Sequence, residues 1–335
     1  MTQRVFSEQE IMSDHPYAKA HEVHGHRLHG GFDADGNYIS PRTLVREPAV
    51  DTWADALRER GGDILAVDPV VQDLPRFPNY AQMKLLLREG IEKPLWNSLT
   101  IISILEGRGR FIGEQPWPDL QQIIVEDVSE MGLGHLRKGL LLAHGLDEGG
   151  EPDKGIGAHD VMWIAVRDLA FGPRDYATPD AAFGNVDRER LVPEIAEPYE
   201  GMIRFMMTLL MIEYAAAATF DFNQRLLRDV DLFTDRRTQA EEAAKIVDRI
   251  CQDEEIHVSS LRTFLGELAS ATVKTLEGGT IAGREVIDRL WAEQMRQTTV
   301  EQPKLRRERE ESELRKHIRA HPDAARIEAE FDALA

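Results

Sequence analysis

The chain has 335 residues, of which 42% are apolar and 30% are charged, the balance of a soluble protein with one or two domains. The net charge of −19 argues against nucleic acid as a partner, because an acidic protein repels phosphate backbones. Cys251 is the single cysteine, which excludes an intrachain disulfide and a cysteine-based zinc or iron–sulfur site and suits a reducing cytosol.

Two features predict a cytoplasmic protein without a membrane anchor. The first residues, Met1 to Phe6, lead into polar and acidic residues with no apolar export signal. The longest apolar run, near 209–220, is interrupted by Glu213 and Tyr214 and is too short and too polar to span a bilayer.

Residues 1–78 are predicted to form an irregular arm, because glycine and proline recur through it. One short helix is expected at 50–60, with Asp51 as its cap. The arm also carries four histidines: His21, His24, His26 and His29. Their spacing fits no metal site, so we expect them to be solvated or structural.

The first long helix is predicted at 80–111, and Glu106 falls on its apolar stripe. Gly107 and Gly109 weaken a helix here but let a neighbouring segment approach closely. Glu106 is therefore a candidate buried ligand. The alternative is a solvated acid at a frayed helix end.

A second helix is predicted at 119–144, with Asp127, Glu130 and His135 as its polar candidates. On an ideal helix, Glu130 points sideways from the apolar face. A one-residue π-bulge at the internal glycines would bring Glu130 and His135 onto one side.

Residues 145–197 are rich in Gly, Pro and Asp and are predicted to form a long crossover with one short helix at 159–171. The third long helix is predicted at 198–228. Glu213 is the one acid among apolar neighbours for three turns on either side. It is either a metal ligand or a buried acid hydrogen-bonded to a Tyr or Arg.

The fourth long helix is predicted at 235–277, and Glu254 and His257 lie in the middle of its apolar face. Desolvating both groups is costly unless they are paired or bind a metal. Glu-x-x-His places the two heads on one side, one turn apart, which suits one metal ion; a buried Glu–His hydrogen bond is the alternative. A further helix is predicted at 282–297, and the charged segment 303–335 is expected to be an exposed or fraying helix.

The spacing of the acids predicts that they meet. Two antiparallel helices place residues level when these are equidistant from the turn between them. Glu213 and Glu254 satisfy this condition in the second predicted hairpin. In the first, Glu106 satisfies it with either Glu130 or Asp127.

The predicted chain forms two antiparallel hairpins with a long connection between them. It carries a lone Glu on the first and third helices and Glu-x-x-His on the fourth. This pattern resembles the ferritin-like di-metal carboxylate superfamily. The resemblance covers 80–144 and 198–270 and implies an all-α, ferritin-like four-helix bundle. The bundle is placed at 79–278, between the N-terminal arm at 1–78 and a C-terminal charged helical extension at 279–335. The metal ligands that the resemblance implies are Glu106, Glu130, His135, Glu213, Glu254 and His257. The second helix departs from the family pattern, because Glu130 and His135 stand five apart and Asp127 competes as the first ligand.

Carboxylate and imidazole donors suit iron or manganese. The resemblance implies two iron ions, with manganese or a mixed pair as alternatives, and an O₂-dependent oxidoreductase that acts on a small organic substrate. The alanines at 215–218, with Met206 and Phe220, would line an apolar pocket or simply pack the core. The electron donor is unidentified, no nucleic acid or membrane is expected to take part, and the sequence allows a homodimer.

Two other functions remain open at this point. One is a metal-free helical binding or scaffold protein, which the irregular second helix favours. The other is iron oxidation and storage, which the large flanks disfavour because a storage cage needs little beyond the bundle.

Overall fold

The computed structural model describes residues 2–179 and 189–335, and most of these residues lie in helices. The predicted mostly helical class is confirmed. Within the described residues, the paired strands form three antiparallel two-stranded hairpins at the edges of the molecule.

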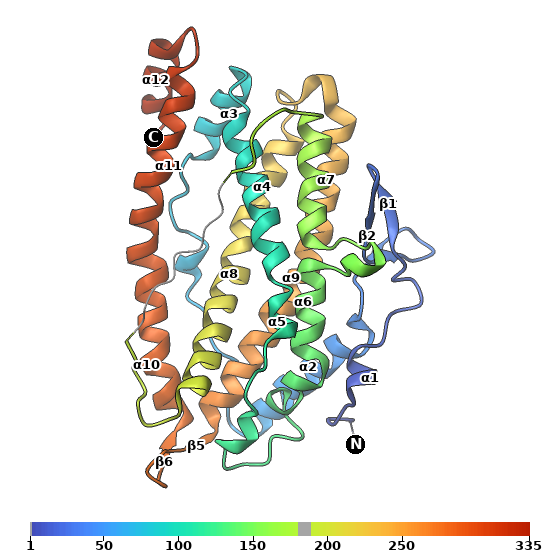
Figure 1. Ribbon diagram of the computed structural model, residues 1–335, viewed down its shortest axis with the longest axis vertical. Coiled ribbons are helices and arrows are strands. Elements are labelled where there is room, and N and C mark those ends of the chain that lie inside the picture. Colours follow the sequence, from blue (N-terminus) through green and yellow to red (C-terminus); the bar gives the residue numbers. More distant parts are fainter. Residues whose placement is uncertain (1, 180–188) are drawn as a thin grey trace.

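Four helical columns stand side by side at the centre (Figure 1). The first is α4 (Lys93–Arg108), and the second is α6 (Leu141–Gly149) continued by α7 (His159–Phe171). The third and fourth are α8 (Glu197–Arg228) and α9 (Arg237–Ser270). Helix α9 packs against α7 and α8, and α7 packs against α4, so the second column lies between α4 and α9.

The predicted first helix is two helices in the structure. Helix α3 (Tyr80–Arg88) begins at an Asn79 capping box, and α4 follows after a sharp bend. Gly90 occupies this bend with φ of 75°, and Pro94 lies in the first turn of α4, where its missing N–H is tolerated. Glu106 lies in the last turn of α4 and short helix α5 (Phe111–Glu114) follows.

The predicted helix at 119–144 is wrong, because loop residues and short 3₁₀ and π turns make up 119–140, and the α-helix begins only at Leu141. A Cβ on Gly134 would lie 2.1 Å from the Val128 carbonyl oxygen, so the backbone is too close for a regular helix. The buried Glu267 carboxyl accepts hydrogen bonds from the N–H groups of Gly132, at 3.1 Å, and Leu133, at 3.0 Å. Burial raises the pKa of Glu267 to about 7 despite these two donors.

The helix predicted at 159–171 is confirmed, but its assignment to the crossover is wrong. It is α7, which continues the α6 column after the loop 150–158 (Figure 1). Gly172, with φ of 68°, ends α7, and the connection to α8 begins there.

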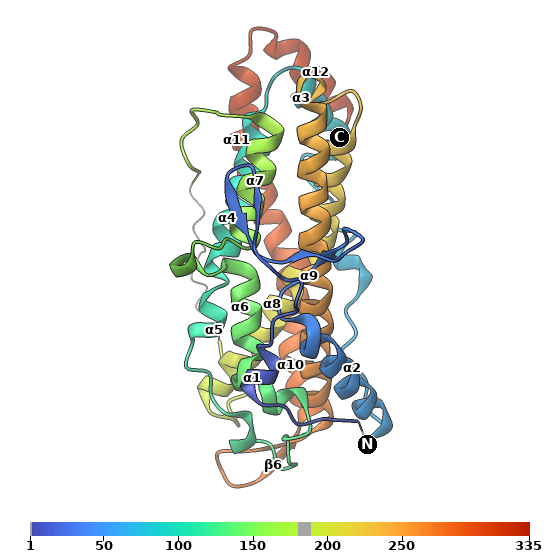
Figure 2. The same ribbon diagram turned by 90° about the vertical axis from the view of Figure 1, so that its right-hand side faces the viewer.

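The N-terminal arm lies across one side of the bundle (Figure 2). Helix α2 (Thr43–Glu59) packs against α9, and strand β2 (His26–Leu28) packs against α7. The expected short helix at 50–60 is the second half of α2. The elements of the arm are α1 (Glu8–Ile11), β1 (His21–Val23), β2 (His26–Leu28), β3 (Gly31–Phe32), β4 (Tyr38–Ile39) and α2 (Thr43–Glu59).

The C-terminal segment was expected to be exposed, but it is partly buried. Helix α11 (Gln302–Arg319) packs against α4, and α12 (Ala324–Ala333) packs against α3. Leu314, Ile318, Ile327 and Phe331 are the buried residues of this helical pair. The C-terminal elements are β5 (Thr272–Lys274), β6 (Thr280–Ala282), α10 (Gly283–Arg296), α11 (Gln302–Arg319) and α12 (Ala324–Ala333).

By length and composition alone, α8 could cross a bilayer, with a mean hydropathy of 1.4 over its most apolar window. Inside the molecule, 44% of that window is buried, and the helix packs against α9. This arrangement is compatible with the core helix of a soluble protein.

Candidate metal centre

Seven carboxyl and imidazole groups from the four columns converge at one place; six of them are buried and Glu106 is half-buried. Every column contributes at least one of them. They form two overlapping groups, within each of which the candidate ligand atoms all lie within 4.8 Å of one another. The seven residues are Glu106 of α4, His144 and Glu148 of α6, His159 of α7, Glu213 of α8, and Glu254 and His257 of α9.

The first group, the nitrogen-rich half, consists of His144, Glu148, Glu213 and His257. Nε2 of His144 lies 3.2 Å from a Glu213 carboxylate oxygen and 3.5 Å from one of Glu148. The rings of His144 and His257 stack with their centroids 3.8 Å apart. Two imidazoles and two carboxylates therefore face one point.

The second group, the oxygen-rich half, consists of Glu106, Glu148, His159 and Glu254. Nδ1 of His159 lies 3.5 Å from Oε2 of Glu148 and 3.3 Å from Oε1 of Glu254. A Cβ on Gly109 would lie 2.4 Å from Cβ of Glu148, so this glycine allows the end of α4 to approach α6. The predicted close approach at Gly109 is confirmed.

Two carboxylates lie between the halves, each with one oxygen toward either side. Glu148 directs Oε1 toward His257, at 3.1 Å, and Oε2 toward His159, at 3.5 Å. Glu254 directs Oε2 toward His257, at 2.8 Å, and Oε1 toward His159, at 3.3 Å. This is the placement that bridging ligands between two cations require.

Each of two histidines is held from behind by an aspartate on a different helix. Nε2 of His257 lies 3.2 Å from Asp147 of α6, and Nε2 of His159 lies 3.1 Å from Asp253 of α9. The Nδ1 atoms consequently face the centre. A carboxylate behind a metal-ligating imidazole orients the ring and fixes its tautomer.

The carboxyl and imidazole groups of the centre strongly shift one another's pKa values. Despite burial, Glu148 holds the pKa of His159 well above its usual range, and Glu254 does the same for His257. Burial, reinforced by Glu148, holds the pKa of Glu106 well above its usual range, and burial with Glu254 does the same for Glu213. Burial lowers the pKa of His144 to about 4, with help from neighbouring His257. Protons on two of the carboxyls thus reduce a charge that a bound cation would neutralise.

The residues fit two divalent cations in number, charge and chemistry. Four carboxylates balance the charge of two such ions, and the oxygen and imidazole donors suit iron or manganese. Oε1 of Glu148, Oε1 of Glu254 and Nδ1 of His159 are buried and make no hydrogen bond of good geometry with the described residues. Buried polar atoms of this kind are costly unless a ligand satisfies them.

Four of the six predicted ligands, Glu106, Glu213, Glu254 and His257, join the two groups. The second-helix candidates do not, because the segment that carries them is not helical. Glu130 is exposed, and its carboxylate lies 3.8 Å from Arg4. Its rival Asp127 is also exposed and accepts a hydrogen bond from the Ser129 N–H, at 2.9 Å.

His135 is buried but has a structural role. Its Nδ1 lies 2.7 Å from the Met131 carbonyl oxygen, and its Nε2 accepts a hydrogen bond from the Phe6 N–H, at 2.9 Å. The ring also packs on Trp53, with the centroids 4.7 Å apart. Nδ1 therefore fixes the ring to its own segment, and Nε2 holds the N-terminal arm.

Sequence reasoning missed His144, Glu148 and His159, which stand in place of Glu130 and His135. The glycines around Glu148 suggested a loop. In the sequence, residues 150–158 separate Glu148 from His159, its partner in the oxygen-rich half. One signal was available. The chain contains two Asp-Glu dipeptides, Asp147-Glu148 and Asp253-Glu254, and in both the Glu enters the centre while the Asp supports a histidine from another helix.

Of the four arm histidines, His29 alone is buried beside the centre. Its Nε2 lies 3.2 Å from Asp253, and it forms a third group of candidate ligand atoms with His159 and Asp253. His24 is exposed, as expected. Met206 and Phe220 are buried in the core, which is one of the two roles considered for them.

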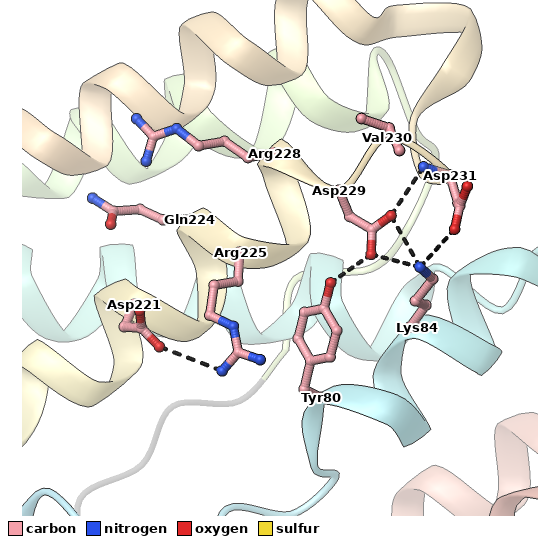
Figure 3. A pocket seen from close by; sticks show the side chains of 9 residues that line it. All are labelled: Tyr80, Lys84, Asp221, Gln224, Arg225, Arg228, Asp229, Val230 and Asp231. Atoms are coloured by element: carbon pink, nitrogen blue, oxygen red, sulfur yellow. Dashed lines mark hydrogen bonds and ion pairs between the residues drawn. The ribbon is translucent and has the colours of Figure 1, made fainter.

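The larger of the two pockets described, with a volume of about 540 Å³, lies away from this centre, near the C-terminal end of α8 (Figure 3). Its cations already have partners: Lys84 is paired with Asp229 and Asp231, and Arg225 with Asp221. Arg225 is twelve residues from Glu213 along α8, or about 18 Å at the rise of an α-helix. The pocket is therefore separate from the candidate metal centre.

Comparison of the chain with protein-family models, curated proteins and solved structures gives no match.

Proposed function

We propose that this protein is an O₂-dependent oxidoreductase with two metal ions, most simply iron, that acts on a small organic substrate. Its bundle would be a ferritin-like one with a divided second helix. The observation that carries the proposal is the pair of ligand groups that share Glu148. Two separate cation sites need no shared carboxylate, whereas a coupled pair of ions does.

The residues of the chain would do three things. Glu148 and Glu254 would bridge the halves, and Glu106 and Glu213 would each serve one half. The three histidines would add nitrogen donors and distinguish the halves from each other. The apolar core around the centre, including Met206 and Leu210, would exclude bulk water. A bound pair of reduced irons would supply the activation of O₂.

The test is anaerobic reconstitution of metal-free protein with ferrous iron. We expect about two irons per chain after removal of excess metal. The electronic spectrum should change when O₂ is admitted to the reduced protein. Absence of bound iron would overturn the proposal and favour a metal-free scaffold.

The size of the assembly distinguishes the remaining alternative. An oxidase with large flanks is expected as a small assembly, and the chain is expected to remain soluble in the cytosol. A large hollow assembly that retains many irons per chain would instead indicate iron storage.

A further inference from the structure

The N-terminal arm reaches both aspartates that stand behind the ligand histidines. Asp147 is fully buried, and Arg42 and Arg46 contact its two oxygens, at 2.7 and 2.6 Å. Both arginines are themselves buried. The Asp147 carboxylate therefore links two arginines of the arm to His257.

Asp253 makes a matching set of contacts on the other half. Its Oδ2 lies 3.1 Å from Nε2 of His159, 3.2 Å from Nε2 of His29 and 3.3 Å from the Tyr38 hydroxyl. His29 and Tyr38 belong to the arm and are buried. Asp253 therefore links the arm to His159.

The backbone of the arm is attached to the same region. The His29 N–H donates to the Gly157 carbonyl oxygen, at 2.8 Å, and the Gly157 N–H donates to the Arg27 carbonyl oxygen, at 2.9 Å. Gly157 lies in the loop that ends at His159. The arm thus contacts both the backbone that leads to this histidine and the carboxylate behind its ring.

The backbone at Arg42 also indicates a specific role. Its φ is 58°, a left-handed conformation that is uncommon for residues other than glycine. Such a conformation persists where surrounding contacts require it. Here it accompanies the contact between the Arg42 guanidinium and Asp147.

We propose that the N-terminal arm is a part of the metal centre. Arg42 and Arg46 position His257, whereas His29 and Tyr38 position His159. This inference rests on the two-metal function proposed above. A buried carboxylate can orient an imidazole only if its own negative charge is stabilised, and the arm groups beside each aspartate stabilise it. The two sets of contacts serve different halves, so their effects are separable.

The test compares Arg46→Gln and His29→Asn in the full-length chain. The matched controls are Arg58→Gln, on the exposed side of the same helix, and His24→Asn, in the turn of the hairpin that ends just before His29. Metal-free proteins are titrated with Mn²⁺ alone, and free Mn²⁺ is measured by electron paramagnetic resonance. Loss of a contact behind a ligand histidine is expected to weaken binding by about 10- to 100-fold.

We expect each test variant to lower the affinity for one of the two Mn²⁺ ions by this factor, while both controls bind Mn²⁺ as the wild type does. The two variants should lower the affinity for different ions, and the double variant should lower the affinity for both. Arg46→Lys keeps the positive charge but not the planar guanidinium group, so it should lower the affinity for the same ion as Arg46→Gln does. It also serves as the deciding variant if Arg46→Gln does not fold.

Hydrogen exchange distinguishes the proposed role from a merely structural one, because metal would not change amide exchange in an arm that is uncoupled from the centre. Because coupling between two binding events is reciprocal, Mn²⁺ should slow amide exchange in residues 21–46 of the wild type. In Arg46→Gln this metal-dependent protection should shrink near residues 42–46.

The outcomes separate this inference from the proposed function. Two Mn²⁺ ions in the wild type and unchanged affinities in folded arm variants would overturn the role of the arm and leave the metal centre standing. No Mn²⁺ binding by the wild type, together with no iron in the reconstitution, would overturn both.

Discussion

At the scale of single residues, the centre depends on acids that occupy apolar positions. Glu213 and Glu254 are buried within long helices, where an unpaired carboxylate would be destabilising. Glu148 is the most connected of the acids, because it belongs to both ligand groups. Its substitution therefore tests the centre as a unit.

Glu148→Gln should abolish the binding of both ions, because the amide offers neither the negative charge nor two equivalent ligand oxygens. Iron per chain after anaerobic reconstitution should fall from about two to near zero. Circular dichroism should show that helicity is kept. Glu130→Gln, which changes an exposed acid outside the centre, should retain the iron content of the wild type; equal iron in both variants would contradict the assignment.

At the scale of elements, the division of the second column brings Glu148 and His159 together. Helix α6 ends at Gly149, and α7 begins at His159, so the loop between them sets the distance of this histidine from Glu148. Gly150 has a φ of 62° and a ψ of −159°, a conformation that is essentially restricted to glycine. A Cβ there would lie 2.5 Å from the Ile156 carbonyl oxygen.

Gly150→Ala should destabilise the protein by about 1–3 kcal/mol through backbone strain, with a further cost from the clash. It should also weaken metal binding in the oxygen-rich half, because His159 moves with the loop. Denaturant unfolding and metal titration measure the two effects. Gly155→Ala is the control: Gly155 also has positive φ, at 65°, but its Cβ would meet nothing within 4 Å. Metal affinity as low in Gly155→Ala as in Gly150→Ala would refute the role of the loop contact.

At the scale of the whole molecule, the flanks are built into the core. The C-terminal helices bury Phe331, whose ring meets Phe77 with the centroids 5.9 Å apart. The N-terminal arm reaches the centre itself. The two flanks have different neighbours: the arm contacts the aspartates behind the ligand histidines, whereas α11 packs against α4 and α12 against α3.

Phe331→Ala should lower the free energy of unfolding by about 3–5 kcal/mol, because it opens a cavity in a packed interior. The number of bound ions per chain should not change. Leu334→Ala, at a position that is 39% exposed, should change stability by less than about 0.5 kcal/mol. Thermal or denaturant unfolding with parallel metal analysis checks both variants, and loss of metal in folded Phe331→Ala would show that the C-terminal helices do support the centre.

The sequence alone determined the features that depend on local patterns. The helices at 198–228 and 159–171 follow from apolar periodicity and end signals, and the buried acids Glu213 and Glu254 appear as exceptions to that periodicity. Equal spacing from the intervening turn also places these two acids level, and both reach the centre. Such features need only the geometry of one helix or one hairpin.

Only the tertiary structure decided the second column and the role of the arm. The segment that carries Glu130 and His135 has helical periodicity, but close backbone contacts and the distant Glu267 carboxyl hold it in turns. His159 comes next to Glu148 because a loop folds out of the bundle and α7 then continues the α6 column. Glu267 holds the first of these segments, and Arg27 and His29 of the arm hold the loop at Gly157. These contacts join residues more than a hundred positions apart, which no local pattern in the chain encodes.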